Sequence, residues 1–173
     1  MSDELKFHLD KVLEHVKNAK EGLPIDVFYF VSQLTPLINV ELLSKNKKGQ
    51  VLLTWRDDRF YGPAWHIPGG IIRFKEKIED RIEQVARLEL GATINYAAEP
   101  IHIRGLINKE RDIRGHFISM LYLCELTSDP VAGKSYKAGE PKRGEWAWHD
   151  HAPINLLKVQ ESFRRFIDDT PPL

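Results

Sequence analysis

The chain has 173 residues, 42% of them hydrophobic and 29% charged, so it is long enough to bury a core as a globular domain. Its 25 Lys and Arg residues balance 25 Asp and Glu residues, which argues against a protein that holds a nucleic acid polymer by general electrostatic attraction. The single cysteine, Cys124, excludes an internal disulfide and a cysteine-based zinc site, and it favours a reducing, cytoplasmic compartment. No apolar run approaches the length of a membrane span, so we expect neither a membrane segment nor a signal peptide.

The N-terminal segment has the pattern of an amphipathic helix over residues 3–20, closed by Gly22-Leu23-Pro24. Apolar residues recur there at helical spacing: Leu5, Leu9, Val12, Leu13 and Val16. We expect residues 1–22 to form an extension that packs against the domain or a partner subunit, and residues 23–173 to form one domain. Pro24 suits the first turn of a second helix, which ends before Pro36.

The middle of the chain predicts strands over residues 37–43 and 51–54, joined as a hairpin by the turn-like run 45–49. Residues 57–70 have the composition of a loop. A helix is predicted over residues 77–90, with its apolar side formed by Ile78, Ile82, Val85, Ala86 and Leu88, and Gly91 ends it.

The remaining segments predict strands over residues 101–107, 116–126 and 146–148, with a long polar loop over residues 128–144. A last helix carries Leu156, Leu157, Phe163, Phe166 and Ile167. This order of elements favours an α/β sandwich with a mixed sheet over a doubly wound unit.

Residues 68–92 hold the most informative motif: Pro68-Gly69-Gly70, then Glu76, then Glu89-Leu90-Gly91. This run resembles the Nudix box, whose consensus is Gly, five residues, Glu, seven residues, Arg-Glu, an apolar residue, any residue, Glu-Glu, any residue, Gly and an apolar residue. The matching positions are Gly70, Glu76, Ala86, Glu89, Gly91 and Ala92. The departures are Gln84 for the arginine, Val85 for the glutamate after it and Leu88 for the first of the paired glutamates. The resemblance implies a Nudix-type α/β/α fold and hydrolase activity.

The departures change the expected metal chemistry. Positions 85, 88 and 89 lie at helical spacings of three and four, so three carboxylates there could hold several divalent ions. Here that face carries valine, leucine and one glutamate, which leaves a single ion. The candidate ligands are Glu89 and the backbone carbonyl of Gly69, and the candidate ion is Mg²⁺, with Mn²⁺ as the alternative.

The same losses resemble one branch of the family, the GDP-mannose mannosyl hydrolases. Other matching residues support this branch: Thr35-Pro36-Leu37, Glu41, Gly49, Leu52-Leu53, Arg56 and Trp65. The resemblance implies that water displaces a nucleoside diphosphate from the anomeric carbon of a sugar, with help from the metal. It places Arg56 on the leaving diphosphate, Glu41 on the nucleotide and Phe117 at a substrate-contacting loop position.

The branch's loop glutamine and catalytic histidine fall near Lys142 and Arg143 in this chain, so no general base carries over. Lys142 and Arg143 could instead contact phosphates, Arg143 in a catalytic role. The open candidates for the base are Glu140, Glu145, His149 and His116.

Three functional hypotheses follow. The first is a metal-dependent nucleotide-sugar hydrolase of the GDP-mannose type, working as a homodimer. The second is an ordinary Nudix pyrophosphohydrolase of another nucleoside diphosphate derivative. The third is a catalytically inactive nucleotide-binding domain. The products separate the first two hypotheses, and binding without turnover identifies the third.

Overall fold

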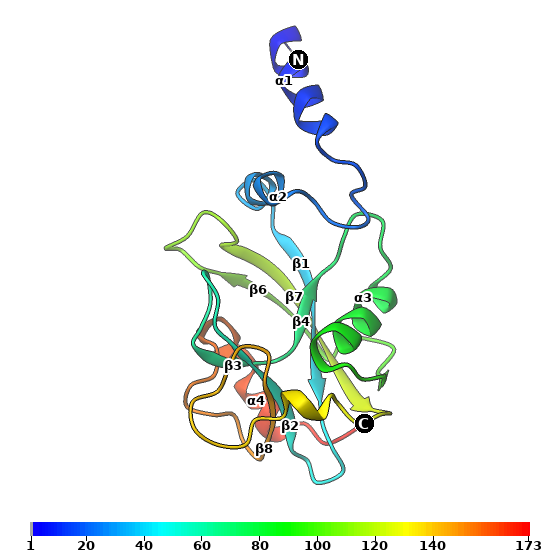
Figure 1. Ribbon diagram of the computed structural model, residues 1–173, viewed down its shortest axis with the longest axis vertical. Coiled ribbons are helices and arrows are strands. Elements are labelled where there is room, and N and C mark those ends of the chain that lie inside the picture. Colours follow the sequence, from blue (N-terminus) through cyan, green and yellow to red (C-terminus); the bar gives the residue numbers. More distant parts are fainter. Residues whose placement is uncertain (1) are drawn as a thin grey trace.

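Two β-sheets form the centre of the fold in the computed structural model, which describes residues 2–173 (Figure 1). The larger sheet has the order β4-β1-β7-β5, with β6 also paired to β7. Its strands are β1 (Leu37–Ser44), β4 (Gly69–Ile71), β5 (Ile94–Tyr96), β6 (His102–Ile107) and β7 (His116–Leu126). Strands β1 and β7 are parallel whereas β4, β5 and β6 pair antiparallel, so the mixed α/β fold is confirmed.

The smaller sheet is antiparallel with the order β3-β2-β8. Its strands are β2 (Val51–Arg56), β3 (Ala64–His66) and β8 (Trp146–His149). The helices are α1 (Asp3–Glu14), α2 (Ile25–Val31), α3 (Ile78–Val85) and α4 (Arg164–Asp169). A π-helical turn (Ala86–Leu90) continues α3, and 3₁₀-helices span Ala132–Lys134 and Lys158–Phe163.

The core follows the alternation of side chains along the central strands. On β1, Val40 and Leu42 pack with Ile82 and Val85 of α3. Leu43 points to the opposite face, where it packs with Leu121 of β7 and with residues of the smaller sheet and the C-terminal helices: Leu53, Trp65, Phe163 and Ile167. The larger sheet therefore lies between α3 on one side and the smaller sheet with α4 on the other (Figure 1).

The predicted hairpin of residues 37–54 is wrong. The two strands exist, but β1 belongs to the larger sheet and β2 to the smaller one, and one isolated bridge from Lys45 to Val51 joins them. Both edges of β1 are already occupied, by β7 over its whole length and by β4. The turn itself is real, because the Asn46 side chain accepts hydrogen bonds from the Lys48 and Gln50 amides.

Several element boundaries also differ from the prediction. The segment expected as a loop contains β3 and most of β4, and β5 was not predicted either. Each of these three strands has only three residues, too few to give a clear sequence pattern. The last helix is a 3₁₀-helix followed by α4, so Leu156 and Leu157 precede it. Leu88, expected on the apolar side of its helix, is 60% exposed because it lies in the π-helical turn rather than in a continuous α-helix.

Helix α1 ends at Glu14, six residues before the predicted end. The amides of His15 and Val16 bond three residues back, and the Asn18 side chain accepts from the Lys20 amide, so local bonds compete with further helix. The helix buries none of its residues, and it projects beyond α2 away from the sheets (Figure 1). Packing of α1 against the domain of its own chain, one of the two expected roles, is therefore absent.

The single cysteine lies in the interior of the fold. Cys124 is a free thiol in the core, and burial raises its pKa to about 12. Among the helices of residues 2–173, none combines the length and apolarity that a membrane crossing requires.

Gly70 on β4 lets α3 approach the sheet closely. A Cβ at this position would lie 2.6 Å from Val85 Cγ2 and 3.1 Å from Arg81 Cδ. We expect Gly70→Ala to lower the free energy of unfolding by about 1–3 kcal/mol through overpacking, as measured by denaturant unfolding. Gly105→Ala on β6 is the matched control, since its added Cβ would meet nothing within 4 Å. Equal stability of the Gly70→Ala protein and the wild type would contradict the packing described here.

Candidate functional site

A cavity of about 390 Å³ opens where polar residues replace apolar ones on the inner face of the larger sheet. Asn39 and Glu41 on β1 and Ser119 on β7 point to the same side as Leu43 and Leu121. The cavity volume is within the range of small-molecule sites. Its walls also include Thr54, Arg56, His66, Gly69, Glu89, Lys134, Arg143 and Gln160.

A hydrogen-bond chain fixes the floor of the cavity. The Ser119 hydroxyl donates to Asn39 Oδ1 at 2.8 Å, so the Asn39 amide nitrogen is left to donate to Glu41 Oε1 at 2.8 Å. From the other side, Gln160 Oε1 accepts the Ile67 amide, and Gln160 Nε2 donates to Glu41 Oε2 at 2.9 Å. The side-chain nitrogens of Asn39 and Gln160 therefore both face Glu41, and each carboxylate oxygen of Glu41 accepts one hydrogen bond.

Glu41 is a buried carboxylate at 5% exposure. Loss of hydration raises its pKa to about 8, against the two amide donors, which lower it. Glu89 also raises the pKa by repulsion, and Arg56 lowers it. The side chain therefore has the surroundings of a group able to exchange a proton near neutral pH.

Glu89 is placed by the π-helical turn at the end of α3, which Gly91 terminates in the left-handed conformation with φ 64°. Such single turns are frequent at functional sites. The Glu89 carboxylate accepts the Gly69 amide and the Thr54 hydroxyl, the latter at 3.4 Å. Burial raises its pKa to about 7, although these bonds and Arg56 oppose the shift.

Gly69 lies between the two carboxylates. A Cβ there would lie 2.4 Å from Glu41 Oε2, so only glycine fits. Hydrogen bonds from β1 to β4 use Pro68 and Ile72, and thus the amide and carbonyl of Gly69 face away from β1, on the side of Glu89. The predicted metal ligands, Glu89 and the Gly69 carbonyl, are therefore adjacent.

These residues fit one divalent ion held by few protein ligands. Within residues 2–173 no group of three or more His, Cys, Asp and Glu side chains is arranged to hold a metal. Glu89 and a glycine carbonyl are oxygen donors of the kind that bind such an ion together with substrate phosphate and water.

His66 also reaches the cavity, and it was not among the predicted site residues. Its Nδ1 lies 2.8 Å from the Thr54 carbonyl, which can only accept, so Nδ1 carries the proton and Nε2 is unprotonated in the neutral ring. Nε2 lies 3.7 Å from Glu89 Oε2. Burial, reinforced by Arg56, lowers the pKa of His66 to about 4, and the ring is neutral at physiological pH.

Arginines form another wall of the cavity. Arg56 donates from Nε to Asp58 Oδ2 at 2.7 Å and stacks on the Tyr61 ring at 4.7 Å, so it is both paired and exposed to the cavity. Among residues 2–173 no carboxylate forms an ion pair with Arg114, and its Nε is buried without a hydrogen bond. Loss of hydration and repulsion by Arg56 lower the pKa of Arg114.

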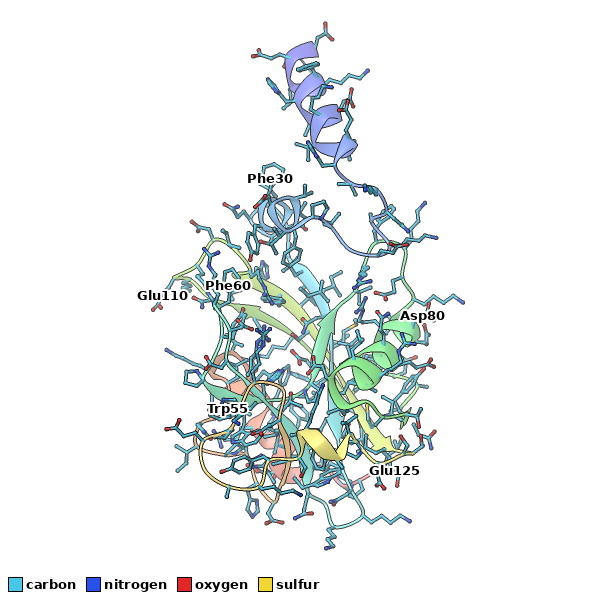
Figure 2. All side chains as sticks on the ribbon, in the orientation of Figure 1. Phe30, Trp55, Phe60, Asp80, Glu110 and Glu125 are labelled. Carbon is cyan, nitrogen blue, oxygen red and sulfur yellow. The ribbon has the colours of Figure 1, made fainter. Side chains whose placement is uncertain are left out.

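An aromatic cluster supports these arginines. Phe60, in the loop after β2, lies beside the β6–β7 connection that carries Glu110 (Figure 2). The Arg114 guanidinium carbon lies 5.2 Å from the centre of the Phe60 ring and 5.6 Å from the centre of the Tyr61 ring. Arg111 stacks on Tyr61 from 4.4 Å and donates to the Phe60 carbonyl, but it does not line the cavity.

The structure brings most of the predicted site residues to this one cavity: Glu41, Arg56, Gly69, Glu89, Phe117 and Arg143. Lys142 is exposed outside the cavity lining. The four open candidates for the base are also outside the cavity lining. Two of them have other contacts: His149 packs on Trp65, and Glu145 accepts a hydrogen bond from the Lys142 amide.

Glu76 of the motif has a structural position. It accepts two hydrogen bonds from the Arg81 guanidinium, at 2.7 and 2.9 Å, and one from the Arg73 amide. Arg81 is 5% exposed. Gln84 stands where the Nudix box has an arginine. Arg81, one helical turn earlier and close to Gly70, is the cation that pairs with Glu76.

The family model described as NUDIX domain matches residues 36–170. The chain belongs to the Nudix family. The match spans β1 to α4 and so includes every cavity-lining residue named above. Members of this hydrolase family generally use divalent metals.

Solved Nudix structures share this fold at low sequence identity. A MutT Nudix hydrolase from Burkholderia pseudomallei is 20% identical, with 78% of this chain and 97% of that chain covered at a TM-score of 0.57. A Nudix hydrolase from Clostridium perfringens is 18% identical, with 78% and 95% covered at a TM-score of 0.57. A UDP-X diphosphatase is 14% identical, with 95% and 77% covered at a TM-score of 0.56. At these identities the likeness shows the fold alone.

Proposed function

We propose that this Nudix protein hydrolyses a nucleotide sugar of the GDP-mannose type, with water attacking the anomeric carbon and a nucleoside diphosphate leaving. The observation that carries the proposal is the composition of the cavity. Glu89 is the one Nudix-box carboxylate that lines it, beside Leu88, while Arg56, Arg114, Lys134 and Arg143 line it as cations.

This charge pattern suits a leaving diphosphate. Four cations, Arg56, Arg114, Lys134 and Arg143, line the cavity together with three carboxylates, and the divalent ion proposed at Glu89 would add two further positive charges. A surplus of positive charge therefore remains for an anionic substrate. Attack at phosphorus would use several metal ions, for which the site has few ligands.

A divalent ion, Mg²⁺ with Mn²⁺ as the alternative, would be held by Glu89 and the Gly69 carbonyl. When bound, it neutralises charge on the diphosphate. Arg56 and Arg143 contact the phosphate oxygens through their guanidinium donors, and Phe117 contacts the substrate at the cavity wall. The role of Lys142 is a longer-range attraction of phosphate from outside the cavity.

Glu41 serves as the general base in this proposal, in addition to any contact with the nucleotide. It is the buried carboxylate of the cavity without a cation partner, and the Asn39 and Gln160 amides hold its orientation. It accepts a proton as the water oxygen bonds to the anomeric carbon, and the bond from that carbon to the diphosphate oxygen breaks with its electron pair. The products are a free sugar and a nucleoside diphosphate.

Product identification tests the proposal. The full chain is incubated with GDP-mannose and a panel of other nucleotide sugars in Mg²⁺ or Mn²⁺, and the products are separated by chromatography. We expect a nucleoside diphosphate and a free sugar. A nucleoside monophosphate with a sugar phosphate would overturn the proposal in favour of a pyrophosphohydrolase, and tight binding without turnover would overturn it in favour of an inactive binding domain.

Arg114 gives a prediction about substrate binding. We expect Arg114→Met to lower kcat/KM about 10- to 100-fold, mainly by raising KM, because a charged donor to the substrate anion is lost. Arg111→Met is the matched control, since this arginine stacks on the same tyrosine outside the cavity. Steady-state kinetics of the two variants provide the measurement, and equal effects would contradict a substrate contact by Arg114.

The oligomeric state is a separate prediction. We propose that residues 1–22 form an extension that contacts a second copy of the chain, because Leu5, Leu9 and Leu13 of α1 are 39–63% exposed. We expect light scattering to find a homodimer at micromolar concentration and a monomer for the Leu9→Glu/Leu13→Glu variant. A monomeric wild-type protein would contradict this expectation.

A further inference from the structure

His66 lines the cavity but has no role in the proposed hydrolysis. It occupies the end of β3, between Trp65 and Ile67, which both point into the core. Alternation along the strand turns His66 the other way, into the cavity, where it is 7% exposed. A buried imidazole with an unprotonated nitrogen facing a cavity needs an explanation beyond packing.

The ring is held in the arrangement that metal-ligating histidines have. Nδ1–H donates to the Thr54 carbonyl at 2.8 Å, and this bond fixes both the ring orientation and the tautomer. The free lone pair on Nε2 has no polar neighbour closer than the Thr54 hydroxyl at 3.5 Å, which is itself 3.4 Å from Glu89 Oε2. Nε2 therefore remains available to another ligand.

The distance to Glu89 fits a shared ion. Nε2 and Glu89 Oε2 are 3.7 Å apart, too far for a hydrogen bond. Metal–nitrogen and metal–oxygen bonds to a small divalent ion are each about 2.0–2.2 Å, so two ligands of one ion lie at most about 4.4 Å apart. One ion between these two atoms would satisfy both.

We propose that His66 Nε2 is a direct ligand of the divalent ion, together with Glu89, and that it makes the site prefer Mn²⁺, Co²⁺ or Zn²⁺ over Mg²⁺. Imidazole suits these first-row ions, whereas Mg²⁺ prefers oxygen ligands. The inference rests on the proposed metal site of Glu89 and revises the identity of the ion expected there.

Pulsed electron paramagnetic resonance of the full-length protein with Mn²⁺ tests the ligand directly. We expect ¹⁴N modulation from a coordinated imidazole in the wild type and its loss in His66→Phe. The matched control is His149→Phe, because His149 is also a partly buried histidine with an unpartnered Nε2, but it packs on Trp65 outside the cavity. Absence of the ¹⁴N signal in wild type, or its persistence in His66→Phe, would overturn the inference.

Calorimetric titration supplies the second readout. Loss of His66 is expected to weaken Mn²⁺ binding at least about tenfold and Mg²⁺ binding much less, with His66→Gln as a second variant if His66→Phe does not fold. Equal weakening for both ions, or no Mn²⁺ binding by the wild type, would overturn it. Turnover is assayed in parallel: hydrolysis without the imidazole signal counts against this inference alone, whereas the signal without hydrolysis counts against the proposed function alone.

Discussion

Replacement of Glu89 by glutamine is expected to lower kcat by about 10³-fold while leaving the protein folded. The carboxylate is the charged ligand of the proposed ion, and loss of the charge neutralisation that the ion supplies corresponds to several kcal/mol of transition-state stabilisation. Glutamine keeps the size of the side chain and can still accept the Gly69 amide. Steady-state kinetics with thermal unfolding provide the measurement.

Glu83→Gln is the matched control, because Glu83 is an exposed carboxylate on the same helix and outside the cavity. We expect it to retain wild-type kcat. Glu89→Gln with wild-type kcat at saturating metal would show that the reaction does not depend on this carboxylate and would remove the proposed metal site.

Glu41→Gln is expected to lower kcat about 10²- to 10⁴-fold with a smaller change in KM, because a proton acceptor is removed from the cavity floor. The matched control is Glu125→Gln on β7, a carboxylate in the same sheet outside this cavity. A large rise in KM with unchanged kcat would instead give Glu41 only the nucleotide contact that the family resemblance implies.

The same variant makes a prediction about stability and pH in the metal-free protein. Burial raises the pKa of Glu41 from 4.5 to about 8, so the folded state favours the protonated form. The stability this form provides is fully present below pH 4.5 and is lost as the pH rises towards 8. Glu41→Gln cannot ionise, and we expect its stability relative to the wild type to rise over this range.

Denaturant unfolding in EDTA between pH 4.5 and 9 measures this dependence. The part of the stability difference that does not vary with pH includes a lost hydrogen bond. The NH₂ group of the new glutamine would face the NH₂ group of Asn39 or Gln160, and neither can accept. The slope with pH does not include that loss. A difference in stability that is independent of pH would mean that Glu41 is not perturbed by burial.

The sequence predicted the fold class because the motif and the long strands carry strong local signals. Residues 116–126 form strand β7, as their β-branched and aromatic composition indicates, and Gly91 ends its helix in the left-handed conformation. The hairpin failed for a nonlocal reason. Each residue of β1 pairs with a residue of β7 that lies 80 positions further along the chain, and no feature of residues 37–54 indicates this pairing.

The sequence pointed to cavity-lining residues where the motif reaches, and it did not point to those that long-range packing brings to the cavity. Glu89 and Gly69 followed from the Nudix box, but His66 and Arg114 did not. The alternation of Trp65, His66 and Ile67 is a usable signal, because a polar residue between two core residues must face a polar space. Arg114 had no such signal. It lies in the β6–β7 connection, and its own backbone adopts the left-handed conformation there, with φ 55°.

Hydrolysis in H₂¹⁸O, with mass analysis of both products, distinguishes attack of water at carbon from attack at phosphorus. We predict that the ¹⁸O enters the free sugar and that the nucleoside diphosphate carries none. Label in a phosphate group, with unlabelled sugar oxygen at the anomeric carbon, would show attack at phosphorus and contradict the account.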